Sequence, residues 1–105
     1  MIMMFENLQD KVLDWAENKG IIDNSTPLKQ LEKTQEELDE TKQALRNNEN
    51  QDEVADGIGD MLVTIIILAE LANLDAVECL RLAYGEIKER KGEMRDGLFV
   101  KEENL

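Results

Sequence analysis

Apolar residues recur every three or four positions along most of the chain, and this spacing predicts amphipathic α-helices. In the first stripe these residues are Phe5, Leu8, Val12 and Trp15. With Gly20, Pro27 and Asp75 as helix-end signals, the pattern predicts helices over about residues 3–18, 27–46, 51–73 and 76–91. A polar break at 47–50 and a tail over 92–105, with a short extended segment at 97–100, complete the chain. No run predicts a convincing strand, so we expect an all-α fold in one domain, 1–105.

The third predicted helix differs from the others because it is apolar on nearly every side from Met61 to Ala69, with Thr64 the lone polar residue. A helix that is hydrophobic all round must be buried all round. Three other helices of this length cannot easily cover it. We therefore expect this helix to pack against a second subunit.

Composition and charge narrow the classes of function. The 12 Lys and Arg residues against 24 Asp and Glu give a formal charge of −12, which argues against nucleic-acid binding through a basic surface. The absence of His excludes histidine-based general base catalysis and histidine-ligated zinc. Cys79, the only cysteine, falls in an apolar helical pattern, so we expect a buried structural thiol. Residues 1–5 are too short for a signal peptide and the apolar run too short to cross a membrane, so we expect a cytoplasmic protein.

Two acidic clusters on successive predicted helices are the main candidates for chemistry. The first contains Glu36, Glu37 and Glu40, and the second contains Glu53, Asp56 and Asp60. At about 100° per residue, the second set falls within an arc of roughly 60° on one helix face. Like charges one turn apart destabilise a helix, whereas Mg²⁺ binds carboxylate oxygens and keeps waters for a phosphate substrate.

Each cluster also has a purely structural interpretation. Alone, the first is typical of a solvated helix face, because Glu is a good helix former. The second could be a glycine-softened helix start, since Gly57 and Gly59 weaken the helix there. The two clusters taken together favour a metal site.

Basic and aromatic residues supply candidate substrate contacts. Lys88, Arg90 and Lys91 would either complement the dipole of the fourth helix or bind phosphate. Trp15 is either a core residue or a platform for a nucleotide base. Gln30 and Lys33 lie about one turn before the first acidic cluster, facing roughly its way.

In combination, these elements resemble the MazG-like, all-α nucleoside triphosphate pyrophosphohydrolases. That family has E-E-x-x-E on one helix and E-x-x-D, followed by an apolar run, on the next. Here Glu36, Glu37 and Glu40 match the first motif, and Asp60 matches the Asp of the second. Further segments similar to small, often phage-borne members are W-A-E-N-K-G-I at 15–21, Q-x-x-K-x-x-E-E at 30–37, A-Y-G-E-I-K-E-R-K-G at 83–92 and G-L-F-V-K at 97–101.

The chain departs from this family pattern at two glycines. The Glu of the second motif falls on Gly57, so we expect Glu53 or Asp56 to supply that carboxylate. Gly85 stands where such members usually have Asn, which affects one nucleotide contact.

The resemblance implies a four-helix arrangement that forms a homodimer through the third helix, or a homotetramer of paired dimers, with sites shared between subunits. It implies hydrolysis of a (d)NTP to (d)NMP and pyrophosphate, for nucleotide-pool control or house-cleaning, in the host cytoplasm if a phage encodes the chain. It implies two or more Mg²⁺ ions, replaceable by Mn²⁺, on carboxylates drawn from Glu37, Glu40, Glu53, Asp56 and Asp60. The implied catalytic residues are Glu36, Glu37, Glu40 and Asp60, with Glu36 orienting or deprotonating the attacking water. The implied substrate contacts are Trp15, Gln30, Lys33, Tyr84, Lys88, Arg90 and Lys91.

The alternative is a non-enzymatic acidic helical protein that imitates the charge of DNA and binds a basic partner. Such a protein would spread its carboxylates over the surface and would need no divalent metal. Clustering of acids at positions i, i+3 and i+7 favours the enzyme.

Overall fold

The computed structural model describes residues 4–47 and 50–105 of the chain. Its elements are α1 (Phe5–Asn18), α2 (Ile21–Asn24), α3 (Pro27–Arg46), α4 (Gln51–Leu71), α5 (Ala76–Ile87), β1 (Gly92–Arg95), β2 (Leu98–Lys101) and a 3₁₀ turn, η1 (Glu102–Asn104). The prediction of a mostly helical chain is confirmed. The expected helix start at residue 3 and the centre of the polar break, 48–49, lie outside the described residues.

Side-chain caps begin three of these helices where the sequence predicts. The Thr26 hydroxyl accepts a hydrogen bond from the backbone N–H of Lys29 (3.2 Å), and Pro27 occupies the first turn of α3. Asn50 and Asp75 cap α4 and α5 in the same way. Gly20, at φ 78°, ends α1 in the left-handed conformation, and the single-turn helix α2 follows where only a linker was expected.

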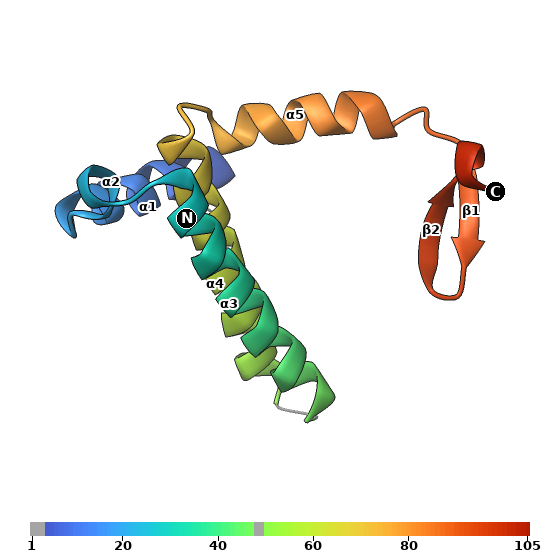
Figure 1. Ribbon diagram of the computed structural model, residues 1–105, viewed down its shortest axis with the longest axis horizontal. Helices are drawn as coiled ribbons and strands as arrows, with labels where there is room; N and C mark the ends of the chain where they lie inside the picture. Colours follow the sequence, from blue (N-terminus) through green and yellow to red (C-terminus); the bar gives the residue numbers. More distant parts are fainter. Residues whose placement is uncertain (1–3, 48–49) are drawn as a thin grey trace.

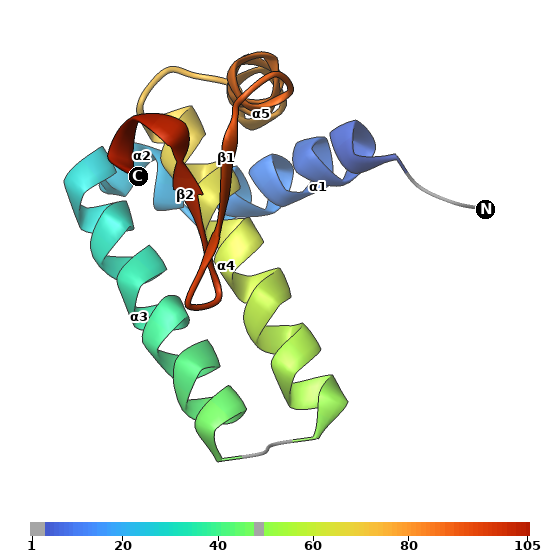
Figure 2. The same ribbon diagram turned by 90° about the vertical axis from the view of Figure 1, so that its right-hand side faces the viewer.

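Helices α3 and α4 lie side by side as an antiparallel pair (Figure 2). The buried Gln30 side-chain amide donates to the Thr64 carbonyl across this contact, at 3.1 Å. Further along, a Cβ placed on Gly57 would lie 2.5 Å from Thr41 Oγ1, so glycine permits the close approach of the two helices. The buried apolar residues Ala16, Ile66 and Ile67 place the small core where α1 crosses α4.

The C-terminal tail folds as an antiparallel β-hairpin. The extended segment expected at 97–100 corresponds to β2, whereas β1 and its pairing with β2 were not expected. Met94 pairs with Phe99, and the two-residue loop Asp96-Gly97 has φ values of 50° and 83°. Positive φ at both loop positions defines the type I′ turn that matches the twist of a hairpin, and Asp-Gly is among its preferred sequences. The preceding helix ends at Ile87, four residues earlier than expected, because the apolar stripe stops there and the chain enters β1 at Gly92.

Helix α5 and the hairpin extend away from the α3–α4 pair (Figure 1). The radius of gyration is 16.2 Å, against about 13 Å for a closely packed chain of 100 residues. Cys79 is exposed, so its predicted burial is wrong; it lies on α5, which extends away from the α3–α4 pair (Figure 1). None of the helices in the described ranges is long and apolar enough to traverse a lipid bilayer.

Candidate active site

The α3–α4 pair has two different sides, one acidic and one apolar. Gln30 and Thr41 of α3 contact Thr64 and Gly57 of α4. At about 100° of helical rotation per residue, the acidic residues of both helices fall on one side of this contact and a set of apolar residues falls on the other. We call the first the acidic side: Glu36, Glu37 and Glu40 of α3 with Glu53, Asp56 and Asp60 of α4. We call the second the apolar side: Leu31, Leu38 and Leu45 of α3 with Ile58, Leu62 and Ile65 of α4.

Glu37 is the electrostatic centre of the acidic side. Its side chain is only 12% exposed. Burial raises the pKa of Glu37 above its usual value, and the negative charges of Glu40 and Asp60 raise it further. The negative charges of Glu40 and Asp60 therefore disfavour the charged form of Glu37.

Lys33 is the nearest basic partner of these acids. Its ammonium lies 3.5 Å from Glu36 Oε2 and 3.6 Å from Glu37 Oε1. The pKa of Lys33 is raised, chiefly because the negative charge of Glu36 stabilises the ammonium. This lysine partly offsets the repulsion within the cluster.

Two cavities open beside the acidic side, and Trp15, Asp60 and Val63 line both of them. One, of about 250 Å³, is completed by six further residues: Ile21, Gln30, Lys33, Glu37, Thr64 and Ile67. The other, of about 370 Å³, is completed by Leu8, Lys11 and Val12 of α1. The indole of Trp15, 48% exposed, thus stands beside a mainly apolar space next to a carboxylate cluster.

Glu53 and Asp56 are exposed and line neither cavity. Their common face with Asp60 follows from the unbroken helix α4. Within residues 4–47 and 50–105, no three or more His, Cys, Asp or Glu side chains are arranged to hold a metal ion. The carboxylates are electrostatic neighbours, but their oxygens do not converge on one point.

The predicted contacts on and after α5 are absent from both cavities. Tyr84 is 61% exposed on α5. Arg90 and Lys91 line a separate, polar cavity of about 320 Å³ near the hairpin, with Lys101, Glu102 and Glu103. Tyr84, Lys88, Arg90 and Lys91 therefore do not line the cavities that contain Trp15, Gln30 and Lys33.

The sequence interpretation named Trp15 of α1 but overlooked the other α1 residues that line the cavity, Leu8, Lys11 and Val12. Leu8 and Val12 belong to the same apolar stripe as Trp15, and Lys11 follows that stripe around the cavity wall. Spacing of four and seven residues could have placed Leu8 beside Trp15. The position of Asp60 beside this stripe depends on the packing of α1 across α4, which the sequence does not reveal.

Comparison with known proteins shows similarity to a phage protein. The chain is 35% identical over 72 residues to the "Uncharacterized 18.2 kDa protein in rep-hol intergenic region" of Haemophilus phage HP1 (strain HP1c1). The match covers 69% of this chain and 44% of that protein, so the chain spans less than half of the relative's length. No family model matches the chain, and no solved structure matches it.

Proposed function

We propose that this chain is a metal-dependent nucleoside triphosphate pyrophosphohydrolase that converts a (d)NTP to (d)NMP and pyrophosphate. The observation that carries the proposal is a cavity lined by Glu37, Asp60, Lys33 and Trp15, in which the negative charges of Glu40 and Asp60 help to raise the pKa of Glu37. Perturbed carboxylates in a cleft are typical of functional sites. The order of sequence motifs that resemble MazG-like proteins agrees with this arrangement.

Glu37, Glu40 and Asp60 are the residues that would hold Mg²⁺ or Mn²⁺, with a fourth carboxylate from α4. Asp56 lies one turn from Asp60, about 6 Å along the helix axis, whereas Glu53 lies about 10.5 Å away. Asp56 is therefore the better substitute for the family carboxylate that falls on Gly57. Bound divalent cations would neutralise phosphate charge and lower the pKa of an attacking water.

The chain's own side chains bind and orient the nucleotide. Trp15 supplies a stacking face for the base, and Leu8 and Val12 extend the apolar wall. Lys33, which now contacts Glu36 and Glu37, would bind a phosphate oxygen of the nucleotide. Glu36, exposed beside Lys33, then orients the attacking water or accepts its proton. The Gln30 amide donates a hydrogen bond to the Thr64 carbonyl and so joins α3 to α4. The same side chain lines the cavity in which the ligand would bind.

Tyr84, Lys88, Arg90 and Lys91 would contact the phosphates from a second subunit, in a homodimer or a homotetramer of paired dimers. The exposed residues Ile58, Leu62 and Ile65 on the apolar side of α4 support self-association. The similarity to a phage protein supports a phage origin. The role that we propose is nucleotide-pool control or house-cleaning, within the host cytoplasm.

The test is release of pyrophosphate from a panel of canonical (d)NTPs with Mg²⁺, with Mn²⁺ and with a chelator. We expect metal-dependent formation of (d)NMP and pyrophosphate in equal amounts, abolished by the chelator. The ranking of the nucleotides would define the base and sugar preference.

A metal-binding measurement without nucleotide keeps this test decisive. Mg²⁺ or Mn²⁺ should raise the unfolding temperature of the wild-type chain, because a ligand that binds only the folded state stabilises it. The variant Asp60→Asn should lose most of that shift, and Glu32→Gln, which changes an exposed acid paired with Lys29, should keep it. Absence of both turnover and a metal-dependent shift would contradict the proposal and favour an acidic protein that binds a basic partner.

A further inference from the structure

The larger of the two cavities beside the acidic side lies between α1 and α4, and we call it the α1 cavity. Its volume is about 370 Å³, and it is lined by Leu8, Lys11, Val12, Trp15, Asp60 and Val63. It shares Trp15 and Asp60 with the smaller cavity, in which Lys33 and Glu37 would meet phosphate and metal. A nucleotide whose phosphates lie in the smaller cavity therefore places its base in the α1 cavity.

The α1 cavity offers few polar groups to a ligand. All of its lining residues belong to α1 or α4, in which the backbone N–H and C=O groups are used by helical hydrogen bonds. The two residues nearest the ends of α1 are also satisfied, because the Leu8 N–H donates to the chain before the helix and the Trp15 C=O accepts from the chain after it. Three of the lining side chains are aliphatic. Recognition of a ligand thus depends on the side chains of Lys11, Trp15 and Asp60.

Two of these three side chains can only donate hydrogen bonds. A lysine ammonium has three donors and the tryptophan indole has one, and neither has an acceptor. Asp60 is the single acceptor, and its negative charge acts on Glu37, in the carboxylate cluster that we propose for the cation. With that carboxylate engaged there, the side chains that remain for a ligand in the α1 cavity are donors.

The ammonium of Lys11 is available to such a ligand. Its side chain is exposed, and none of the ion pairs within residues 4–47 and 50–105 includes it, although Asp14 lies about one turn further along α1. Lys33 differs, because its ammonium lies 3.5 Å from Glu36 Oε2. The aliphatic stem of a lysine packs along an apolar wall while its ammonium reaches a polar edge.

We propose that Lys11 makes the α1 cavity selective for nucleotides with a keto base, which are those of guanine, thymine and uracil. This inference names the substrate class of the proposed hydrolysis and rests on it, in that the ligand is a nucleotide. The O6 and N7 atoms of guanine and the O4 atom of thymine accept hydrogen bonds from lysine. Adenine and cytosine have an amino group in place of the keto oxygen, and this donor finds no acceptor on Lys11. Stacking on Trp15 is open to every base and does not discriminate.

The experiment measures binding of nucleosides to the full chain in the presence of Mg²⁺. Trp15 is the only tryptophan, so its indole N–H resonance in the NMR spectrum reports occupancy of the cavity directly. Inosine and adenosine differ in having a keto or an amino group, as do uridine and cytidine. We expect the keto member of each pair to bind at least about 10-fold more tightly, because a hydrogen bond to a charged group is a strong one. Nucleosides contain no phosphate, so this measurement needs no hydrolysis.

Two lysines provide matched variants. Lys11→Met keeps an unbranched apolar stem and removes the ammonium, and we expect the preference within each pair to fall to about 3-fold or less. Lys19→Met removes the same charge from the residue that follows α1, which lines neither cavity, and should keep the full preference. Far-UV circular dichroism checks that both variants keep their helix content.

Equal binding of the two members of each pair by the wild type would overturn the proposal. The same is true if Lys11→Met weakens all four nucleosides equally, because Lys11 would then act only through its charge. An indole resonance that no nucleoside shifts would also overturn it.

Release of pyrophosphate separates this inference from the proposed hydrolysis. Equal release from all bases would keep the hydrolysis and overturn the keto preference. A nucleoside preference that depends on Lys11, without any release, would support base recognition in the α1 cavity and contradict only the hydrolysis.

Discussion

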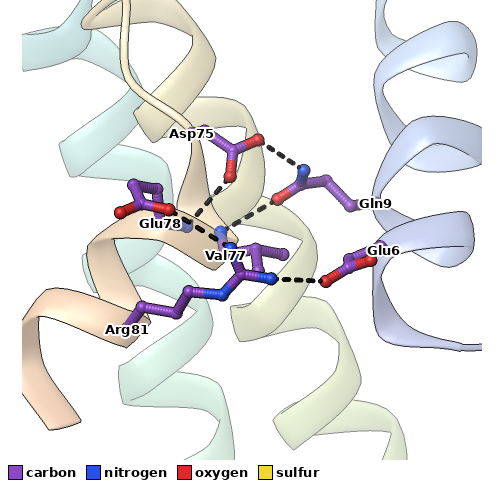
Figure 3. A network of polar contacts seen from close by, with 6 residues as sticks. All are labelled: Glu6, Gln9, Asp75, Val77, Glu78 and Arg81. Carbon is purple, nitrogen blue, oxygen red and sulfur yellow. Dashed lines mark hydrogen bonds and ion pairs between the residues drawn. The ribbon is translucent and has the colours of Figure 1, made fainter.

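The α3–α4 pair and the C-terminal arm (α5, β1, β2 and η1; residues 76–104) both carry apolar faces. Only the α3–α4 pair buries some of its residues within one chain. In the pair, the buried polar residues Gln30, Thr41 and Thr64 find hydrogen-bond partners across or within the helices. In the arm, the hydrogen bonds of Gln9 with Asp75 and Val77 join the root to α1 (Figure 3), whereas the apolar residues Leu80, Tyr84 and Ile87 of α5 stay exposed. The contrast teaches that local order and completed burial are separate properties, and that the arm has the first without the second.

Removal of charge from the acidic side should have the largest effect. Glu37→Gln, Glu40→Gln and Asp60→Asn should each lower pyrophosphate release by at least about 100-fold, because each removes an oxygen donor for the metal. The oligomeric state of the protein in solution should not change, because these substitutions leave the apolar side intact. Steady-state kinetics at saturating metal, with Glu32→Gln as the control, makes this measurement. Parental turnover in any of the three would disprove the metal assignment.

The two glycines of α4 should respond in opposite directions to the same substitution. Gly57→Ala would press a methyl group against Thr41 Oγ1 at 2.5 Å and should cost about 1–3 kcal/mol. Gly59→Ala meets nothing within 4 Å and should stabilise the helix by about 0.5–1 kcal/mol. Urea unfolding followed by circular dichroism compares the two variants. If both stabilise the chain, the close contact of α3 with α4 at Gly57 is wrong.

Severing the root of the arm should have a smaller effect on stability. Gln9→Ala removes the partner of both the Asp75 carboxylate and the Val77 N–H, and should cost roughly 1–2 kcal/mol. Asn7→Ala, on the exposed side of α1, serves as the control. The same urea titration measures both variants. An unchanged midpoint for Gln9→Ala would show that the root is not held by this side chain.

The smallest expected effect is a dependence of stability on pH through Glu37. Its pKa is higher in the folded chain than the ordinary value of 4.5. The folded state therefore binds the proton more tightly than the unfolded state. This contribution is fully present below pH 4.5 and is lost as the pH rises through the folded pKa.

Without metal, Glu37→Gln should consequently be more stable than the wild type at neutral pH, and this advantage should shrink on acidification toward pH 4.5. Thermal unfolding of the two proteins at a series of pH values with chelator tests this sign. A variant that is less stable than the wild type at neutral pH would contradict the repulsion between Glu37, Glu40 and Asp60.

Much of the helical architecture could be predicted because it depends on local chemistry. Thr26, Asn50 and Asp75 cap helices whose apolar stripes repeat at helical spacing, and these signals need no knowledge of the rest of the fold. The hairpin was missed although its local signal, Asp96-Gly97 between apolar pairs, is present in the sequence. Its strands of four residues are too short to produce a clear alternating pattern.

The sequence by itself determined where α3, α4 and α5 begin, which residues share a helix face, and that the acids of α3 and α4 form two clusters. It did so because capping and helical periodicity act over a few residues. Only the tertiary structure decided that Glu37 and Asp60 face each other, that α1 adds Lys11 to the cavity wall, and that Cys79 and the arm stay uncovered. These features depend on the crossing of α1 over α4 and on the close contact at Gly57, which join residues far apart in the chain.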